Sequence, residues 1–164
     1  MYKQIANGYD ELYGKEQEEK LKKIAYVLKG RILDIGAGTG IVARHFNNVV
    51  SIDPCKEMLN QAPGKKVIAS AEKIPFNEGD FDTIVSLTAL HHTDIDKVIK
   101  EIKRLKPKNI AFTILKRSSK CKEIVRKLKK EFEMKEIEEE VKIADEAYKR
   151  AQLLVSDIAQ MSKP

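Results

Sequence analysis

Short apolar runs alternate with segments of helical periodicity along most of the chain. The runs that predict buried strands are residues 32–35, 49–53, 67–68, 81–87 and 109–115. The segments that predict helices are residues 15–28, 41–47, 54–62, 94–105 and 119–130. Strands that form continuous apolar runs, each followed by a helix, are typical of a parallel sheet covered on both faces. The pattern therefore predicts an α/β fold with a doubly wound, mostly parallel sheet.

The end of the chain carries a different pattern. Residues 132–141 alternate between apolar and charged side chains, which predicts a sixth strand. Residues 143–161 carry apolar side chains at helical spacing, which predicts a helix instead of a further strand. A chain of 164 residues suits a single domain. We expect that domain to consist of an N-terminal segment and helix (1–30), a sheet core (31–141) and a C-terminal helical tail (142–164).

A glycine-rich turn joins the first predicted strand to its helix. Residues 31–40 are RILDIGAGTG, with Gly36, Gly38 and Gly40 at every second position. Glycines allow a sharp turn and the close approach of a ligand, although a plain tight connection would also suit them. The second strand ends in Asp53, about where nucleotide-binding βαβ units place a carboxylate on the ribose hydroxyls. The pattern differs from the dinucleotide fingerprint, whose third glycine lies one position later.

Four motifs in the right order resemble the class I S-adenosylmethionine-dependent methyltransferases. LDIGAGTG resembles motif I of that family, and SIDPCKEML resembles motif II. SAEKIPFNEGDFDTIVS, followed by LTALHH, is similar to the segment around the fourth strand in the type 11 branch. That branch includes the ubiquinone and menaquinone C-methyltransferases. The resemblance covers residues 9–115 and implies a Rossmann-like methyltransferase fold.

The resemblance implies that S-adenosyl-L-methionine is the methyl donor and S-adenosyl-L-homocysteine the product. It places Asp34 at the amino end of the donor, Asp53 on both ribose hydroxyls and Pro54 under the adenine. Tyr9 is a candidate lid residue over the donor, and an anchor for the N-terminus is an equally good interpretation. The implied cofactor-binding residues are Tyr9, Asp34, Gly36, Ala37, Gly38, Asp53, Pro54, Ser70, Ala71 and Leu87.

The chain departs from the family pattern in two places. Relatives often have Asp-Ala before the E-K-x-P-F stretch, and the carboxylate accepts a hydrogen bond from the adenine amino group. Here the pair is Ser70-Ala71, so we expect a weaker hydrogen bond from Ser70, some loss of donor affinity, and contact through the Ala71 N–H. The family also normally ends in a hairpin of a sixth and a seventh strand. The predicted C-terminal helix implies that the seventh strand is missing or disguised.

His91 and His92 are weak candidates for a catalytic base. A neutral imidazole near the acceptor could take its proton. Methyl transfer from a sulfonium already has a reactive leaving group, however, so alignment in a closed site can supply most of the rate enhancement. A structural or pocket-lining role is therefore favoured over a base, and the sequence shows no metal-ligand spacing.

The net charge of +6 conceals a strongly basic stretch. Residues 97–130 contain fourteen Lys and Arg and two Glu, which gives this stretch a charge of +12. If the two predicted helices of the stretch lie side by side, their outward residues form one basic face. The residues expected on this face are Lys97, Lys100, Arg104, Lys122, Arg126 and Lys129, with Lys116, Arg117 and Lys120 at the mouth of the donor site. RNA is therefore a possible acceptor, through Lys116, Arg117, Lys120 and Arg126 in particular.

The remaining features of the composition narrow the class of protein. No apolar stretch is long enough to span a membrane and the N-terminus lacks the apolar run of a signal peptide, so we expect a cytoplasmic protein. Cys55 and Cys121 are expected to be ordinary free cysteines. The 34% charged content, rich in Lys and Glu and without Trp, is typical of proteins from hot environments. We expect a methyltransferase acting on a small metabolite, with RNA as an alternative acceptor and a donor-binding subunit that needs a protein partner as a third hypothesis.

Overall fold

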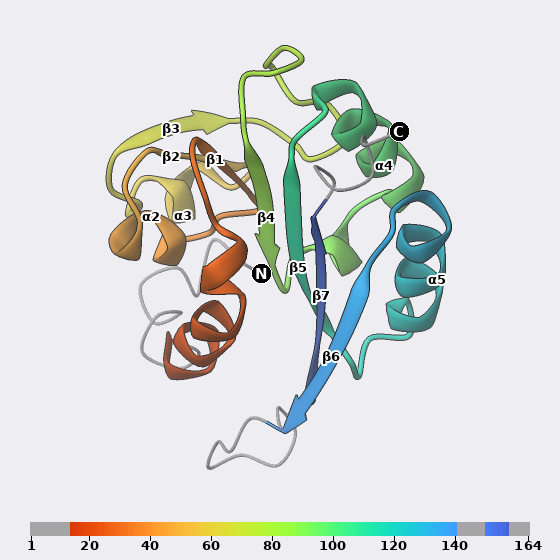
Figure 1. Ribbon diagram of the computed structural model, residues 1–164. Helices are drawn as coiled ribbons and strands as arrows, with labels where there is room; N and C mark the ends of the chain where they lie inside the picture. The colour runs from red at the N-terminus through yellow and green to blue at the C-terminus, as the bar shows by residue number, and fades with distance from the viewer. Residues whose placement is uncertain (1–13, 141–149, 158–164) are drawn as a thin grey trace.

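The computed structural model describes residues 14–140 and 150–157, and it shows a twisted sheet with helices on both faces (Figure 1). The strands are β1 (Ile32–Ile35), β2 (Val49–Asp53), β3 (Lys65–Ile68), β4 (Thr83–Leu87), β5 (Asn109–Leu115), β6 (Lys135–Glu140) and β7 (Arg150–Asp157). They form one seven-stranded sheet in the order β3-β2-β1-β4-β5-β7-β6. The first five strands are parallel, and β7 is antiparallel to both β5 and β6. The predicted fold class is confirmed.

The helices follow the strands in the predicted order. Residues 14–24 form a helix that continues into η1 (Ala25–Val27), and the others are α2 (Ile41–His45), α3 (Lys56–Leu59), η2 (Leu90–His92), α4 (Ile95–Leu105) and α5 (Cys121–Glu131). Helix α3 is shorter than the predicted helix over residues 54–62. It starts later because the carboxylate of Asp53 binds the N–H of Cys55, which keeps Pro54 in a turn. Among the described residues, none of these helices has the length and apolar character needed to cross a membrane.

The prediction of a missing seventh strand and a helical C-terminal tail is wrong for residues 150–157. These residues form β7, which pairs with β5 along its whole length and with β6 on its other side. A strand that lies between two others often carries apolar residues in an unbroken run, and such a run suits a helix and a strand equally well. Periodicity alone therefore could not decide between a helix and a strand for residues 150–157, whose sequence is RAQLLVSD.

Alternate residues of the central strands pack on opposite faces of the sheet. On one face Ile84 and Phe112 contact the apolar sides of α4 and α5. On the other face Ile32 and Val85 pack with the N-terminal helix and α2. Because both faces are covered, these strands are apolar at nearly every position. Helices α4 and α5 lie side by side, as predicted, and an ion pair of 2.7 Å between Asp96 and Lys127 joins them.

The topology places a crevice at the point where the strand order reverses. The chain moves outward from β1 to β2 and β3, and then returns to β4 on the other side of β1. The carboxyl ends of β1 and β4 therefore send their connections in opposite directions. Open α/β sheets bind their ligands at this position.

Candidate functional site

A cavity opens at the carboxyl ends of β1, β2 and β4. Six of the predicted site residues line it, namely Gly36, Gly38, Asp53, Pro54, Ala71 and Leu87. A smaller cavity adjoins it and is lined by Asp34 and Ala37 together with Gln17 of the N-terminal helix. The two cavities share Gly36, Gly38 and Leu87 in their linings, and we call the two together the crevice. Ser70 lines neither cavity, and Tyr9 lies outside the described residues.

The glycine turn after β1 forms the floor of this crevice. Gly36 and Gly38 have positive φ values of 66° and 56°. A Cβ on Gly36 would come within 2.5 Å of the Ala89 Cβ, so this position excludes any side chain. The turn is also tied to β2, because the N–H of Ala37 donates to the carbonyl oxygen of Ile52 at 3.0 Å. Gly36 and Gly38 line both cavities, so the turn borders the space that a ligand can enter.

Asp53 presents an oriented carboxylate at the end of β2. Its Oδ2 accepts a hydrogen bond of 2.9 Å from the N–H of Gly38, and its Oδ1 accepts one of 2.8 Å from the N–H of Cys55. The residue is 9% exposed and lines the larger cavity. Each carboxylate oxygen can accept a further hydrogen bond. The arrangement suits a ligand that offers two adjacent hydroxyl groups.

Asp34 is a buried carboxyl group at the smaller cavity. It is 1% exposed, and its Oδ2 has no hydrogen-bond partner among the described residues. Burial, and to a lesser extent the nearby charge of Asp53, raises the pKa of Asp34 well above its usual range. An unpaired buried carboxyl group is costly, and a ligand cation beside it would offset that cost.

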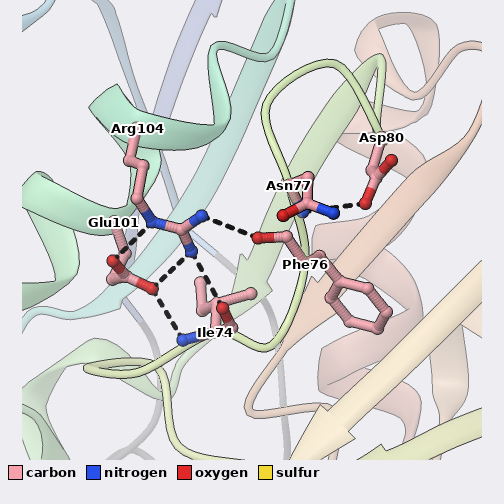
Figure 2. Close-up of polar contacts among 6 residues, drawn as sticks. All are labelled: Ile74, Phe76, Asn77, Asp80, Glu101 and Arg104. Atoms are coloured by element: carbon pink, nitrogen blue, oxygen red, sulfur yellow. Dashed lines mark hydrogen bonds and ion pairs between the residues drawn. The ribbon is translucent and has the colours of Figure 1, made fainter.

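The segment between β3 and β4 forms one wall of the larger cavity and is held by two residues of α4 (Figure 2). Arg104 donates from Nη2 to the carbonyl oxygen of Ile74 at 2.8 Å and from Nη1 to that of Phe76 at 2.7 Å. Glu101 accepts from the N–H of Ile74 at 2.7 Å and binds Arg104 through both carboxylate oxygens. The hydrogen bond from Arg104 lowers the pKa of Glu101. We call these two residues the α4 clamp.

The α4 clamp was not predicted from the sequence. Arg104 was expected on an outward basic face, and the structure shows instead that its guanidinium is turned onto the segment after β3. Arg104 is exposed, as predicted, but helical spacing gives the direction of a side chain and not its partners, so these contacts could not be predicted. The spacing of Glu101 and Arg104, three positions apart on one helix, was the available signal.

A buried polar network surrounds Thr88, which follows β4 and lines the larger cavity. Thr88 has a φ of 55°, which is rare for a β-branched residue. Its Oγ1 accepts a hydrogen bond of 3.2 Å from Lys20 and lies 3.1 Å from the Oγ1 of Thr113. Lys20 is 1% exposed and forms an ion pair of 2.5 Å with Glu16. This network fastens the N-terminal helix to the ends of β4 and β5.

The network also escaped sequence prediction. Burial lowers the pKa of Lys20, while the hydrogen bond to Glu16 opposes this effect. Glu16 and Lys20 stand four positions apart, a spacing typical of an exposed helical ion pair, so their burial could not be predicted from the sequence. Thr88 is more than sixty positions from Lys20 in the chain, a separation that no local pattern spans.

His91 and His92 lie in η2, with ring centroids 3.8 Å apart. His92 lines the larger cavity and His91 does not. Burial, followed by the charges of His92 and Lys120, lowers the pKa of His91 to about 4. Its Nδ1 is buried without a hydrogen-bond partner among the described residues. A base with so low a pKa is weak at neutral pH, which favours the pocket-lining interpretation.

Comparisons with known proteins agree with this geometry. A family model described as "Methyltransferase domain" matches residues 33–113, which is about half of the chain. The uncharacterized protein MJ1123 of Methanocaldococcus jannaschii is 35% identical over 115 residues, covering 64% of this chain and 55% of the relative. The ubiquinone/menaquinone biosynthesis C-methyltransferase UbiE of Geotalea uraniireducens is 29% identical over 132 residues, covering 64% of this chain and 56% of that protein.

The fold is shared with solved methyltransferase structures. A SAM-dependent methyltransferase of Thermotoga maritima, described as a possible histamine N-methyltransferase, superimposes with a TM-score of 0.77 at 15% identity, covering 96% of this chain and 97% of that one. The chain spans about half the length of the curated relatives that it matches. The motifs, the sheet order and these matches lead to one conclusion: the chain belongs to the class I S-adenosylmethionine-dependent methyltransferases.

Proposed function

We propose that the protein binds S-adenosyl-L-methionine in the crevice and transfers its methyl group to a small metabolite. The observation that carries the proposal is the carboxylate of Asp53, which two backbone N–H groups hold in the lining of the larger cavity. A ribose offers the pair of hydroxyls that such a carboxylate accepts well.

The other residues of the crevice fit the same donor. The donor carries a sulfonium and an α-ammonium group, and the buried Asp34 Oδ2, which has no hydrogen-bond partner among the described residues, is a suitable partner for a cation. The turn through Gly36 leaves no room for a side chain and gives the methionine portion access to the backbone. Pro54 and Ala71 line the larger cavity and offer apolar contact to the base.

The proposed role of the chain in the reaction is binding and alignment. The donor supplies a methyl group bound to a sulfonium. When this group is transferred, the C–S bond breaks and a neutral thioether, which is a good leaving group, departs. The residues of the crevice hold the donor, exclude water and leave the ends of β4 and β5 for the acceptor. His92 lines the cavity beside that region, and we assign it a lining role in preference to proton transfer.

Calorimetry with S-adenosyl-L-homocysteine tests donor binding directly. We expect one saturable site per chain, and Asp53→Ala should weaken binding by about 1.5 to 3 kcal/mol, the range for hydrogen bonds to a charged group. Asp96→Ala, an exposed change on α4, serves as the matched control and should leave binding unchanged. Wild-type protein that shows no saturable binding at millimolar ligand would overturn the proposed function.

RNA is a less well supported acceptor. Several cations of the basic stretch are paired with carboxylates: Lys103 binds Glu131, and Lys127 binds both Asp96 and Glu123. In the α4 clamp the exposed Arg104 is paired with Glu101 and with two carbonyl oxygens. Each such pairing reduces the positive charge available to a phosphate backbone. The proposal of a small metabolite is therefore favoured over RNA.

The hypothesis of a subunit that needs a protein partner has lost its main support. It rested on a missing seventh strand, and the structure contains β7 between β5 and β6. Assay of the purified chain with labelled donor and a metabolite extract separates the possibilities. Incorporation by the chain alone supports the metabolite proposal, and incorporation that requires cell lysate supports a partner.

A further inference from the structure

The connections that follow β4 and β5 lie side by side at one end of the larger cavity. The two strands are parallel neighbours, with Leu87 in register with Thr113, and the N–H of Thr88 donates to the carbonyl oxygen of Thr113 at 2.9 Å. Thr88 begins the connection that carries η2, and η2 packs against both β5 and α5. The loop of residues 116–120, which joins β5 to α5, therefore lies next to η2.

Basic side chains gather around the two histidines of η2. Burial, followed by the charges of His92, Lys120, Arg117 and Lys20, lowers the pKa of His91 to about 4. Burial and the charge of Lys120 also lower the pKa of His92. Charges act this strongly only over short distances, because water and salt screen them further away. The loop after β5 and the N-terminal helix therefore bring three cations close to η2.

The ammonium group of Lys120 is available to a ligand. Lys103 and Lys127 of the same basic stretch are paired with carboxylates of the neighbouring helix. Within the part of the chain that the structure describes, Lys120 forms no ion pair, and it is exposed. Glu16, a carboxylate of the N-terminal helix near this region, is already paired with Lys20. The region beside η2 is therefore positively charged and accessible.

We propose that His92 and Lys120 bind an anionic group of the methyl acceptor, a carboxylate or a phosphate, where η2 borders the larger cavity. The inference rests on the proposed function, because it assumes that the donor occupies the crevice and that the acceptor enters at the ends of β4 and β5. His92 lines the cavity, so a ligand bound to it reaches the cavity from this side. An oxyanion gains charge-assisted hydrogen bonds from an ammonium group and from an imidazole N–H, whereas a cationic acceptor is repelled.

A single oxyanion also suits this surface better than a nucleic acid does. A phosphate backbone gains its affinity from many cations spread along a surface. Here carboxylates pair with several cations of α4 and α5, and the remaining positive groups converge on η2. The proposed acceptor class therefore narrows from a small metabolite to a small carboxylic acid or phosphate ester.

Nuclear magnetic resonance of the histidine rings tests the site, with inorganic phosphate as the probe. The chain contains three histidines, and His45 lies on α2, so its ring signals serve as an internal reference. A bound oxyanion stabilises the imidazolium form. Saturating phosphate should therefore raise the pKa of His92 by roughly half a unit or more, and the ring signals of His45 should titrate as they do without phosphate. Acetate in place of phosphate distinguishes the two sources, because the tighter of the two probes indicates the group that the acceptor carries.

Two variants of the basic stretch provide a matched comparison. Lys120→Gln removes the proposed ammonium group, and Lys122→Gln removes the same charge from an exposed position on α5. We expect Lys120→Gln to weaken the binding of phosphate by roughly fivefold or more, and Lys122→Gln to leave it within about twofold of wild type. The thermal unfolding midpoint of each variant shows whether the fold is intact.

Three results would overturn the inference. Phosphate that leaves the titration of His92 unchanged excludes the site. An equal effect on His45, or an equal loss of binding in Lys120→Gln and Lys122→Gln, means that the anion binds nonspecifically. Calorimetry with S-adenosylhomocysteine supplies the third: phosphate that competes with this ligand lies in the donor site, whereas an unchanged affinity supports a site for the acceptor.

The failure of the proposed function is a separate result. If wild-type protein does not bind S-adenosylhomocysteine at all, the proposed function fails, and the assignment of the anion to a methyl acceptor fails with it. The titration of His92 with phosphate still reports on the anion site in that case, because it requires no donor.

Discussion

At the scale of single residues, acidic groups in the crevice differ sharply in their surroundings. The carboxylate of Asp53 is satisfied by two backbone N–H groups, whereas Asp34 is buried with one oxygen unpaired. Burial raises the pKa of Asp34 and favours its neutral form until a cation lies beside it. Both residues were predicted from the glycine turn and the end of the second strand. Their different electrostatics could not be predicted, because burial depends on the packing of distant elements.

Protonation of His91 should make the stability of the protein depend on pH. The pKa of His91 in the folded protein is about 4, below the usual value near 6.5, so the unfolded chain binds its proton more readily. The stability that this residue contributes is therefore present above about pH 6.5 and is lost as the pH falls toward 4. We expect His91→Asn to flatten the decrease of the thermal unfolding midpoint over this range.

His45→Asn provides the control for that experiment, since His45 is an exposed residue of α2. Unfolding midpoints at several pH values between about 4 and 7 give the comparison. A wild-type pH profile that His91→Asn leaves unaltered, or that His45→Asn flattens equally, would show that His91 is not the responsible group.

At the scale of elements, the accuracy of each prediction from the sequence depended on how the helix or strand is packed in the fold. The strands β1, β2, β4 and β5 were predicted almost to the residue, because both faces of the sheet are covered and each strand is a plain apolar run. Helix α4 was predicted equally well, because its apolar positions recur on one face. The strand β7 was mistaken for a helix, and the α4 clamp was missed. Both depend on partners that lie far away in the chain.

We expect the α4 clamp to stabilise the segment after β3 more than it stabilises the sheet. Arg104→Met removes hydrogen bonds to two carbonyl oxygens and leaves Glu101 without its cation, so we expect a loss of about 1 to 3 kcal/mol in the free energy of unfolding. Arg104→Lys should restore only part of it, since an ammonium group cannot span the same planar set of acceptors. Denaturant titration measures the difference.

Lys100→Met is the matched control for the clamp, because Lys100 is an exposed residue of the same helix. Limited proteolysis adds a local readout, and cleavage in Arg104→Met should rise first within residues 69–80. Equal stability of Arg104→Met and Lys100→Met would mean that the clamp contributes little.

At the scale of the whole molecule, charge is distributed so that the basic stretch is partly neutralised. Carboxylates of α4 and α5 and of neighbouring loops pair with its cations, as Lys106 does with Glu78 and Lys108 with Asp82. Composition alone revealed the excess of Lys and Arg, but the pairing required the fold. Solvent-exposed pairs of this kind contribute little to stability, yet they reduce the field that a nucleic acid would encounter.

Titration with single-stranded RNA at several ionic strengths tests whether this pairing of charges leaves the protein with only weak affinity for RNA. Each phosphate contact would contribute about −0.7 to the slope of log K against log salt. We expect weak binding, with a slope no steeper than about −2. A steeper slope that falls by about one to two units in the double variant Lys116→Ala and Arg117→Ala, with donor affinity unchanged, would favour RNA as the acceptor.

The position of β7 has a consequence for the order of events during synthesis. Strand β6 leaves the ribosome first, but it reaches the sheet only through β7, which follows it in the chain. Until then β5 has an open edge, with backbone groups that another chain could pair with. The nascent protein therefore contains strands β1 to β4, whose carboxyl ends lie at the crevice, before β7 covers the edge of β5. Termination of translation between residues 135 and 150 would release a chain that has its predicted donor site but an unpaired edge on β5 that is prone to aggregation.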